Sequence, residues 1–255
     1  EHMSNFENQL EILSGIVFEE EDFSKAEALI LEMIKADHPS AEADTFSEFL
    51  SLGADAIEDI EISTTYSIVT KWAVSKYNQE KSNCITNAMQ YADSINTWLN
   101  HRIELVDDPA GINESKIALS LFADIINNSN DAKTAEESTN DYQGYATYSL
   151  LLGLSDGNST LINNAIDAQR KVLSLYQKGK FPEYYNIATF VAGAKRGLAS
   201  TLMEAYEFDR GSYSQYYQEI GELLHGAIKD FETCGTDFDR GYAAKLLKKY
   251  EGYVQ

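Results

Sequence analysis

Apolar residues recur at helical spacing along almost the whole chain, and this periodicity restricts the folds open to it. From Ile85, apolar side chains follow at positions 88, 89, 92, 95 and 99, which places them on one helical face. The same spacing recurs in 162–176 and 220–231, whereas the alternation typical of strands is almost absent. Only 3 prolines and 15 glycines interrupt the sequence. The pattern predicts an all-α fold.

Signals for helix starts agree with this prediction. In Thr134–Glu137 and Ser24–Glu27 a hydroxyl residue precedes a glutamate by three positions, which is the spacing of a capping box. Short polar breaks separate the apolar stripes, and together they indicate about eleven helices. The most polar stretch, 127–140, is predicted to be a longer loop.

Three segments resemble one another: 66–99, 148–176 and 198–231. Each has a helix with aromatic and small residues, a polar turn and a second amphipathic helix. This arrangement resembles the helical hairpins of tetratricopeptide proteins. The second helices start 77 and 58 residues apart, whereas that family has a period of about 34 residues. We therefore expect an irregular stack of antiparallel helical hairpins.

The chain reads as a single α-helical domain over 4–255, and its best candidate for a lobe boundary is the Asp-, Pro- and Gly-containing break at 106–112. Residues 1–3 resemble the remnant of a cloning junction and are excluded. No apolar run reaches the roughly 18 residues needed to cross a bilayer. Cys84 and Cys234 lie 150 positions apart and belong to no Cys-x-x-Cys motif. We expect free thiols and a cytoplasmic protein.

Charge is the most informative part of the composition. The formal net charge is −21. Residues 1–61 contain 17 Asp and Glu against only Lys25 and Lys35, so the acid is concentrated at one end of the sequence. Nucleic-acid phosphates and anionic membrane surfaces would be repelled, whereas a basic protein surface would be attracted. The charge therefore predicts a basic protein as partner, and neither nucleic acid nor membrane.

The candidate partner-binding residues belong to two acidic runs in this region. One explanation is a solvated face that maintains solubility, and the other is a docking surface on which charge steers association. The candidates are Glu19, Glu20, Glu21, Asp22, Asp55, Glu58, Asp59 and Glu61.

Catalytic motifs are absent from the sequence. It has no phosphate-binding Gly-x-x-x-x-Gly-Lys loop, no Gly-x-Ser-x-Gly elbow and no His-Glu-x-x-His zinc motif. Glu222 and His225 have the Glu-x-x-His spacing of di-iron bundles, but such sites need a second copy, which the sequence lacks. We predict no catalytic residue, metal or cofactor. An all-α enzyme or metal carrier built on Glu222 and His225 is the third alternative.

Tyrosines are dense in the second half of the chain. Most are explained by core packing, but two adjacent pairs, Tyr184-Tyr185 and Tyr216-Tyr217, are exceptions. Adjacent helical positions point about 100° apart, so one ring of each pair should lie outside the core. These four tyrosines form the alternative site, a groove that captures a peptide.

In its size, acidity and helical character, the chain resembles the all-α immunity proteins of polymorphic or contact-delivered bacterial toxin systems. The resemblance implies tight one-to-one binding to a toxin domain, often a basic nuclease, whose basic cleft is covered by carboxylates. An immunity protein, or antitoxin, is thus the first hypothesis for function. A helical-repeat adaptor or scaffold with a tyrosine-lined groove is the second, and gene neighbourhood would separate the two.

Overall fold

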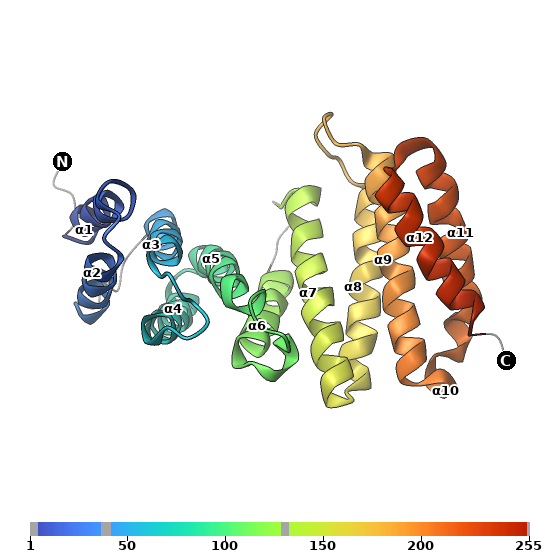
Figure 1. The fold of residues 1–255 in the computed structure, drawn as a ribbon, viewed down its shortest axis with the longest axis horizontal. Coiled ribbons are helices and arrows are strands. Elements are labelled where there is room, and N and C mark those ends of the chain that lie inside the picture. The colour runs from blue at the N-terminus through green and yellow to red at the C-terminus, as the bar shows by residue number, and fades with distance from the viewer. Residues whose placement is uncertain (1–4, 37–41, 129–132, 254–255) are drawn as a thin grey trace. The chain divides into compact units, whose positions relative to one another are not determined.

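The structure is a computed structural model, and it describes residues 5–36, 42–128 and 133–253. Residues 1–3, predicted to be a cloning remnant, lie outside these ranges, as does His38. The all-α prediction is confirmed, because the described residues form helices and no strand. In the described part of the chain, eleven α-helices have eleven or more residues, as expected, and a twelfth, α10, is a single turn (Figure 1).

Two compact units divide the chain, residues 1–128 and 129–255. The predicted boundary at 106–112 falls within the first unit, where α5 connects to α6. Unit 1 contains α1 (Asn5–Gly15), the π-helix η1 (Ile16–Glu20), α2 (Phe23–Lys35), α3 (Ala43–Ala56), α4 (Thr64–Asn83), α5 (Ile85–Ile103), the 3₁₀ turn η2 (Pro109–Gly111) and α6 (Asn113–Asn128). Unit 2 contains α7 (Ala135–Asp156), α8 (Ser159–Lys178), α9 (Ile187–Phe208), α10 (Arg210–Tyr213), the 3₁₀ turn η3 (Ser214–Tyr216), α11 (Tyr217–Cys234) and α12 (Asp237–Glu251).

The three expected helix pairs are packed pairs in the structure. α4 packs on α5, α7 on α8, and α9 on α11 (Figure 1). The antiparallel hairpin stack itself stays a prediction. No helix among the described residues is both long and apolar enough to pass through a membrane.

The two predicted capping boxes have different outcomes. The box at Thr134 is confirmed, and it starts α7 at Ala135. The predicted loop 127–140 is therefore wrong from Ala135 onward, and also at 127–128, which belong to α6. The box at Ser24 is wrong. Asp22 is the N-cap of α2 instead, and its carboxylate accepts a hydrogen bond from the Lys25 backbone N–H at 3.1 Å. A carboxylate there also suits the positive end of the helix dipole.

Aromatic rings fill the core of unit 1. Phe46 stacks on Tyr91 with ring centroids 4.0 Å apart, and Tyr66 stacks on Trp98 at 4.9 Å. Gly53 lets α3 approach this cluster, because a Cβ atom there would lie 3.3 Å from the Trp98 ring. All four rings are nearly or fully buried, and burying such large side chains stabilises the unit most.

Aliphatic residues dominate the core of unit 2. The main cluster joins α8, α9 and α11, and it includes Ile162, Ile166, Leu198, Leu202, Ile220 and Leu224. Gly153 of α7 permits close packing of α8, since a Cβ atom would lie 2.9 Å from Ile162 Cγ1. The helices of unit 2 are therefore closely packed, and this packing holds their surface residues in fixed positions.

Candidate functional site

The two acidic runs predicted from the sequence lie near each other in unit 1. Thr65, at the start of α4, donates a hydrogen bond from Oγ1 to Glu27 Oε2 of α2 at 2.9 Å. The first acidic run leads directly into α2, and the second lies at the end of α3 and in the loop before α4. The π-helix η1 also contacts α3. The starts of α2 and α4 are therefore side by side, with an acidic segment beside each.

A third acidic segment lies at the same end. The guanidinium of Arg102, in the last turn of α5, is 5.5 Å from the centroid of the Tyr66 ring at the start of α4. The same guanidinium pairs with Glu114, in the first turn of α6, at 3.0 Å. The loop between α5 and α6 carries Glu104, Asp107 and Asp108. This loop therefore lies beside the start of α4.

We call these three segments, 18–22, 55–62 and 104–108, the acidic end. They contain eleven carboxylates and no Lys, Arg or His. All eleven side chains belong to exposed residues. Lys25 pairs with Glu20 at 3.0 Å, but both are about half exposed, so this pair neutralises little of the charge. The acidic end therefore presents a concentrated negative surface.

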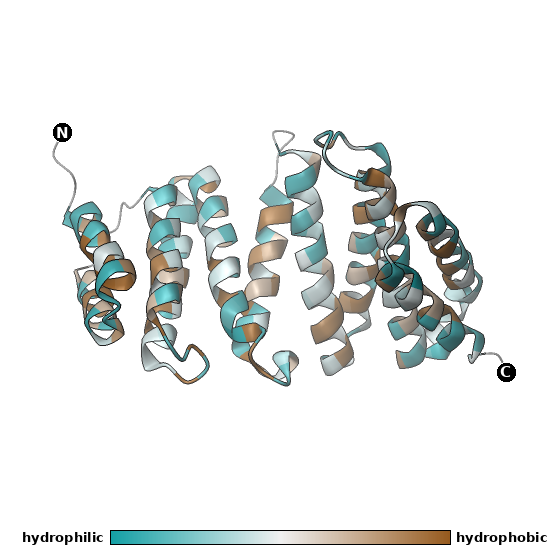
Figure 2. Cartoon of the chain, turned by 45° about the horizontal axis from the view of Figure 1, so that its top comes forward, coloured by the Kyte–Doolittle hydropathy of each residue, from teal (hydrophilic) through white to brown (hydrophobic). Residues whose placement is uncertain are grey.

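Each segment of the acidic end also exposes one large apolar side chain. Phe18 is 61% exposed, Ile62 is 79% exposed and Leu105 is 56% exposed. In Figure 2 the loop before α4 and the loop before α6 carry both hydrophilic and hydrophobic residues. Single exposed apolar residues are ordinary, but three of them, one in each of three neighbouring acidic segments, have the composition of an interface. These three residues were not predicted from the sequence; the signal was an apolar residue within or next to each acidic run.

The backbone of the first segment is unusual. Residues 16–20 form a π-helix, and Glu21 follows in the left-handed region with φ of 52°. π-Turns are rare and occur frequently at functional sites, and a non-glycine residue with positive φ is uncommon. Ile16 and Val17 are buried, whereas Phe18 and the carboxylates after it face solvent. Within the five residues of the π-helix, the chain therefore passes from buried side chains to exposed acidic ones.

The predicted tyrosine site does not form one groove. Tyr185 lines a groove between α7, α8 and α9, whereas Tyr216 lines a different pocket with residues of α8 and α10. Tyr184 is 81% exposed. Tyr217 packs on Tyr250, with ring centroids 4.7 Å apart, at the margin of the unit 2 core. Of the four tyrosines, Tyr185 and Tyr216 thus line separate cavities.

The groove beside Tyr185 is lined by residues that were not predicted from the sequence. Its volume is about 590 Å³, within the range of roughly 300–1,000 Å³ for ligand-binding clefts. Amide side chains and two helical glycines line it: Asn140, Gln143, Gln169, Gly193 and Gly197. Glycines four residues apart inside a helix are the sequence signal that could have found it.

The carboxylate and imidazole proposed for the third alternative lie on the surface of α11. Glu222 and His225 are exposed, and Glu222 accepts a hydrogen bond from Gln218 at 2.9 Å. Within residues 5–36, 42–128 and 133–253, no three His, Cys, Asp or Glu side chains are grouped so as to hold a metal ion. Cys84 and Cys234 are free thiols.

Comparison with known proteins does not identify a family for this chain. No protein-family model matches the chain. No curated protein matches it in sequence either.

Proposed function

We propose that this chain is a non-catalytic binding protein whose acidic end docks onto a basic surface of another protein. The observation that carries the proposal is the exposure of Phe18, Ile62 and Leu105 within segments that hold eleven carboxylates and no base. A face that served solubility alone would gain nothing from exposed Phe, Ile and Leu. In an interface, by contrast, apolar anchors supply affinity and the surrounding charge supplies steering and specificity.

The partner that suits this surface is a basic protein with a shallow apolar depression in its basic face. An immunity protein that covers the cleft of a basic toxin domain is the most specific form of the proposal. It is supported by the chain's acidity, its helical fold and the anchor pattern at the acidic end. The eight predicted acidic residues, together with Glu104, Asp107 and Asp108, would face the partner.

The test measures association with the purified product of the adjacent gene by surface plasmon resonance at several salt concentrations. The charge variant carries Glu58→Lys, Asp59→Lys and Glu61→Lys. We expect a slower association rate, by about tenfold or more at low salt, and a weaker salt dependence. Asp22 is left intact because it caps α2, and its loss would mix a folding defect with a binding defect.

Two further variants make the result specific. A control with Glu11→Lys, Glu32→Lys and Glu48→Lys changes the net charge equally, at exposed positions of α1, α2 and α3 outside the three acidic segments. It should retain most of the association rate. An anchor variant, Phe18→Ser with Ile62→Ser, should chiefly raise the dissociation rate, since apolar contacts form after encounter. Equal slowing by the charge variant and its control would rule out docking through the acidic end.

A further inference from the structure

The groove of unit 2 has two helical walls and an apolar floor. Asn140, Gln143 and Thr147 line one side from α7, at spacings that put them on one helical face. The opposite side comes from α9, between Thr189 and Gly197. The floor is Val172, Tyr176 and Ala194, which are buried and pack together as a cluster. A ligand in the groove would thus lie on a rigid base between two polar rims.

Amide side chains on the rims have free hydrogen-bonding capacity. Asn140 and Gln169 make no side-chain hydrogen bond within the described ranges, and Gln143 makes only a long one, from Nε2 to the Tyr176 hydroxyl at 3.5 Å. A primary amide offers two donors and one acceptor oxygen, so it can pair with both the C=O and the N–H of a peptide unit. The rim therefore has the chemistry that recognises a polypeptide backbone.

Two glycines keep the α9 side of the groove open. A Cβ atom at Gly193 would meet nothing within 4 Å, and one at Gly197 would meet only Gln169 Oε1 at 3.7 Å. Neither position has a positive φ. Neither backbone conformation nor packing therefore requires glycine, although glycine in a helix costs about 1 kcal/mol relative to alanine. Glycine at these positions would leave space for a ligand that approaches the α9 backbone.

One end of the groove is aromatic. The ring centroid of Phe190 is 5.3 Å from that of Tyr176 and 4.9 Å from that of Tyr185, and Phe181 contacts both tyrosines. Phe190 lines the groove and is 40% exposed, so part of its side chain is accessible there. Such a cluster suits an aromatic side chain of a ligand.

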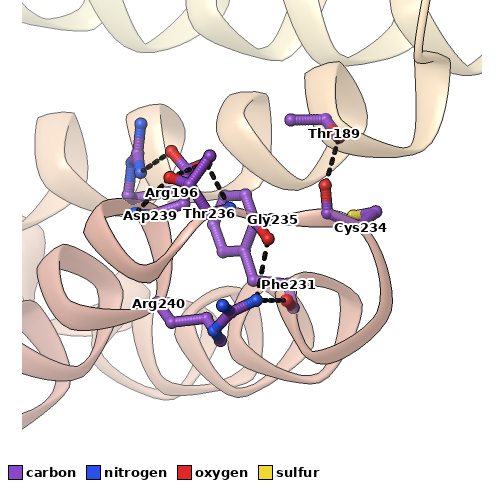
Figure 3. A network of polar contacts seen from close by, with 8 residues as sticks. All are labelled: Thr189, Arg196, Phe231, Cys234, Gly235, Thr236, Asp239 and Arg240. Carbon is purple, nitrogen blue, oxygen red and sulfur yellow. Dashed lines mark hydrogen bonds and ion pairs between the residues drawn. The ribbon is translucent and has the colours of Figure 1, made fainter.

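The charged groups in and around the groove are already satisfied within the protein. Arg196 donates to Asp239 at 3.3 Å, and its guanidinium stacks 5.4 Å from the Phe231 ring and 5.0 Å from the Tyr242 ring. Asp239 also accepts hydrogen bonds from Thr236 (Figure 3). The Tyr185 hydroxyl donates to Glu136 at 2.6 Å. Because these charged groups already have partners, they offer little to a charged ligand, whereas a neutral ligand needs no ionic partner.

We infer that this groove binds an extended, uncharged peptide segment with an aromatic side chain. The amides of α7 and α8 pair with the peptide backbone, the glycines of α9 admit it, and the Phe190 cluster receives the aromatic residue. This site is independent of the acidic end, which lies in the other unit and attracts basic surfaces.

The experiment pans a phage-displayed library of random heptapeptides against the full chain. Recovered sequences are then synthesised as acetylated amides, and their Kd values are measured by fluorescence anisotropy. Gly193→Leu fills the groove, and we expect it to weaken binding by more than tenfold. Gln143→Ala removes one amide, and we expect binding to weaken by about threefold to tenfold.

The control is Gly241→Leu in α12, another helical glycine whose Cβ would meet nothing within 4 Å and which does not line the groove. It should leave the Kd unchanged, and circular dichroism melts verify that all variants fold. Recovered peptides that share an aromatic residue, lack charge and discriminate Gly193→Leu from Gly241→Leu support the inference. The inference is overturned if no heptapeptide binds the wild type, or if the peptides bind Gly193→Leu as tightly. Recovery of only Lys- and Arg-rich peptides that bind the acidic end would overturn it too.

Discussion

The indole N–H of Trp98 donates a hydrogen bond to Thr70 Oγ1 at 2.9 Å, in the interior of unit 1. Trp98 is 1% exposed, and the same hydroxyl donates to the Tyr66 carbonyl at 2.8 Å. This one hydroxyl thus satisfies the only polar group of the Trp98 side chain. Tyr66 stacks on Trp98, and Arg102 lies over Tyr66, so a chain of contacts connects this buried hydrogen bond to the acidic end.

Thr70→Val should therefore destabilise the protein out of proportion to its small change in shape. The valine would leave the Trp98 N–H buried and unpaired, which costs about 1–3 kcal/mol. Urea unfolding, followed by tryptophan fluorescence, measures the loss. Thr97→Val is the control, because Thr97 is exposed and its hydroxyl bonds only to the Asp93 carbonyl one turn earlier. Similar losses for the two variants would contradict the assigned role of Thr70.

The hydrogen bond from Thr65 to Glu27 should couple α2 to α4 energetically. It joins residues 38 positions apart and is partly buried, and a bond to a charged acceptor contributes about 1.5–3 kcal/mol. A double-mutant cycle with Thr65→Val and Glu27→Ala should therefore give a coupling free energy of about 1.5–3 kcal/mol. Additive effects of the two changes would mean that the starts of these helices are held together by other contacts.

Replacing a helical glycine with alanine should raise the free energy of unfolding at some positions and lower it at others. Gly193→Ala and Gly197→Ala should each raise the free energy of unfolding by about 0.5–1 kcal/mol, because alanine favours the helix and the Cβ meets open space. Gly153→Ala should lower it, because its Cβ would lie 2.9 Å from Ile162 Cγ1 and 3.0 Å from the Ile162 backbone nitrogen. Thermal unfolding by calorimetry checks both signs. A loss of stability in Gly193→Ala would show that α9 needs glycine for a reason other than ligand access.

Asp239 should make unit 2 sensitive to acid. Hydrogen bonds from the Thr236 backbone N–H and hydroxyl, together with Arg196, hold the pKa of Asp239 below its ordinary value. Since the folded pKa is depressed, the stabilisation is present above the unfolded pKa of about 3.9 and is lost as pH falls through the folded value. Asp239→Asn should therefore lower the urea midpoint at pH 7 but much less at about pH 3.

The control for this pH dependence is Asp237→Asn in the same turn of α12. Asp237 is fully exposed and pairs only with Arg240, so its removal should have a small effect at either pH. If Asp239→Asn lowers the urea midpoint equally at both pH values, then the Asp239 side chain stabilises the unit through packing and not through its charge.

The helices were predictable because their signals are local. The stripe that starts at Ile85 follows from spacing along a few turns, and Thr134 with Glu137 forms its capping box within one turn. Even so, a local signal can be ambiguous. Ser24 and Asp22 are both good N-caps, and the choice of Asp22 is consistent with Glu27 bonding instead to Thr65, a residue of another helix.

The candidate sites were only partly predictable because they combine residues from distant segments. The acidic runs are visible in the sequence, but their proximity rests on Thr65–Glu27 and on Arg102 over Tyr66. The groove brings Gln143 of α7 opposite Gly193 of α9, and the periodicity of a single helix cannot reveal which helices face one another. Tyr216 and Tyr185 were grouped by residue type, whereas the fold assigns them to different cavities.

The π-helix at residues 16–20 allows the chain to lose one residue at this place without turning the acidic residues that follow. A π-turn holds about one residue more than an α-turn, and each residue of an α-helix advances the chain by 100°. Deleting the codon for Val17 or Phe18 would let this stretch close as an ordinary α-turn, and because a π-turn and an α-turn each complete about one turn, Glu19, Glu20 and Glu21 would keep about the same direction. Deleting one codon from α1 instead, where no turn holds an extra residue, would rotate the same three carboxylates by about 100° relative to the preceding helix.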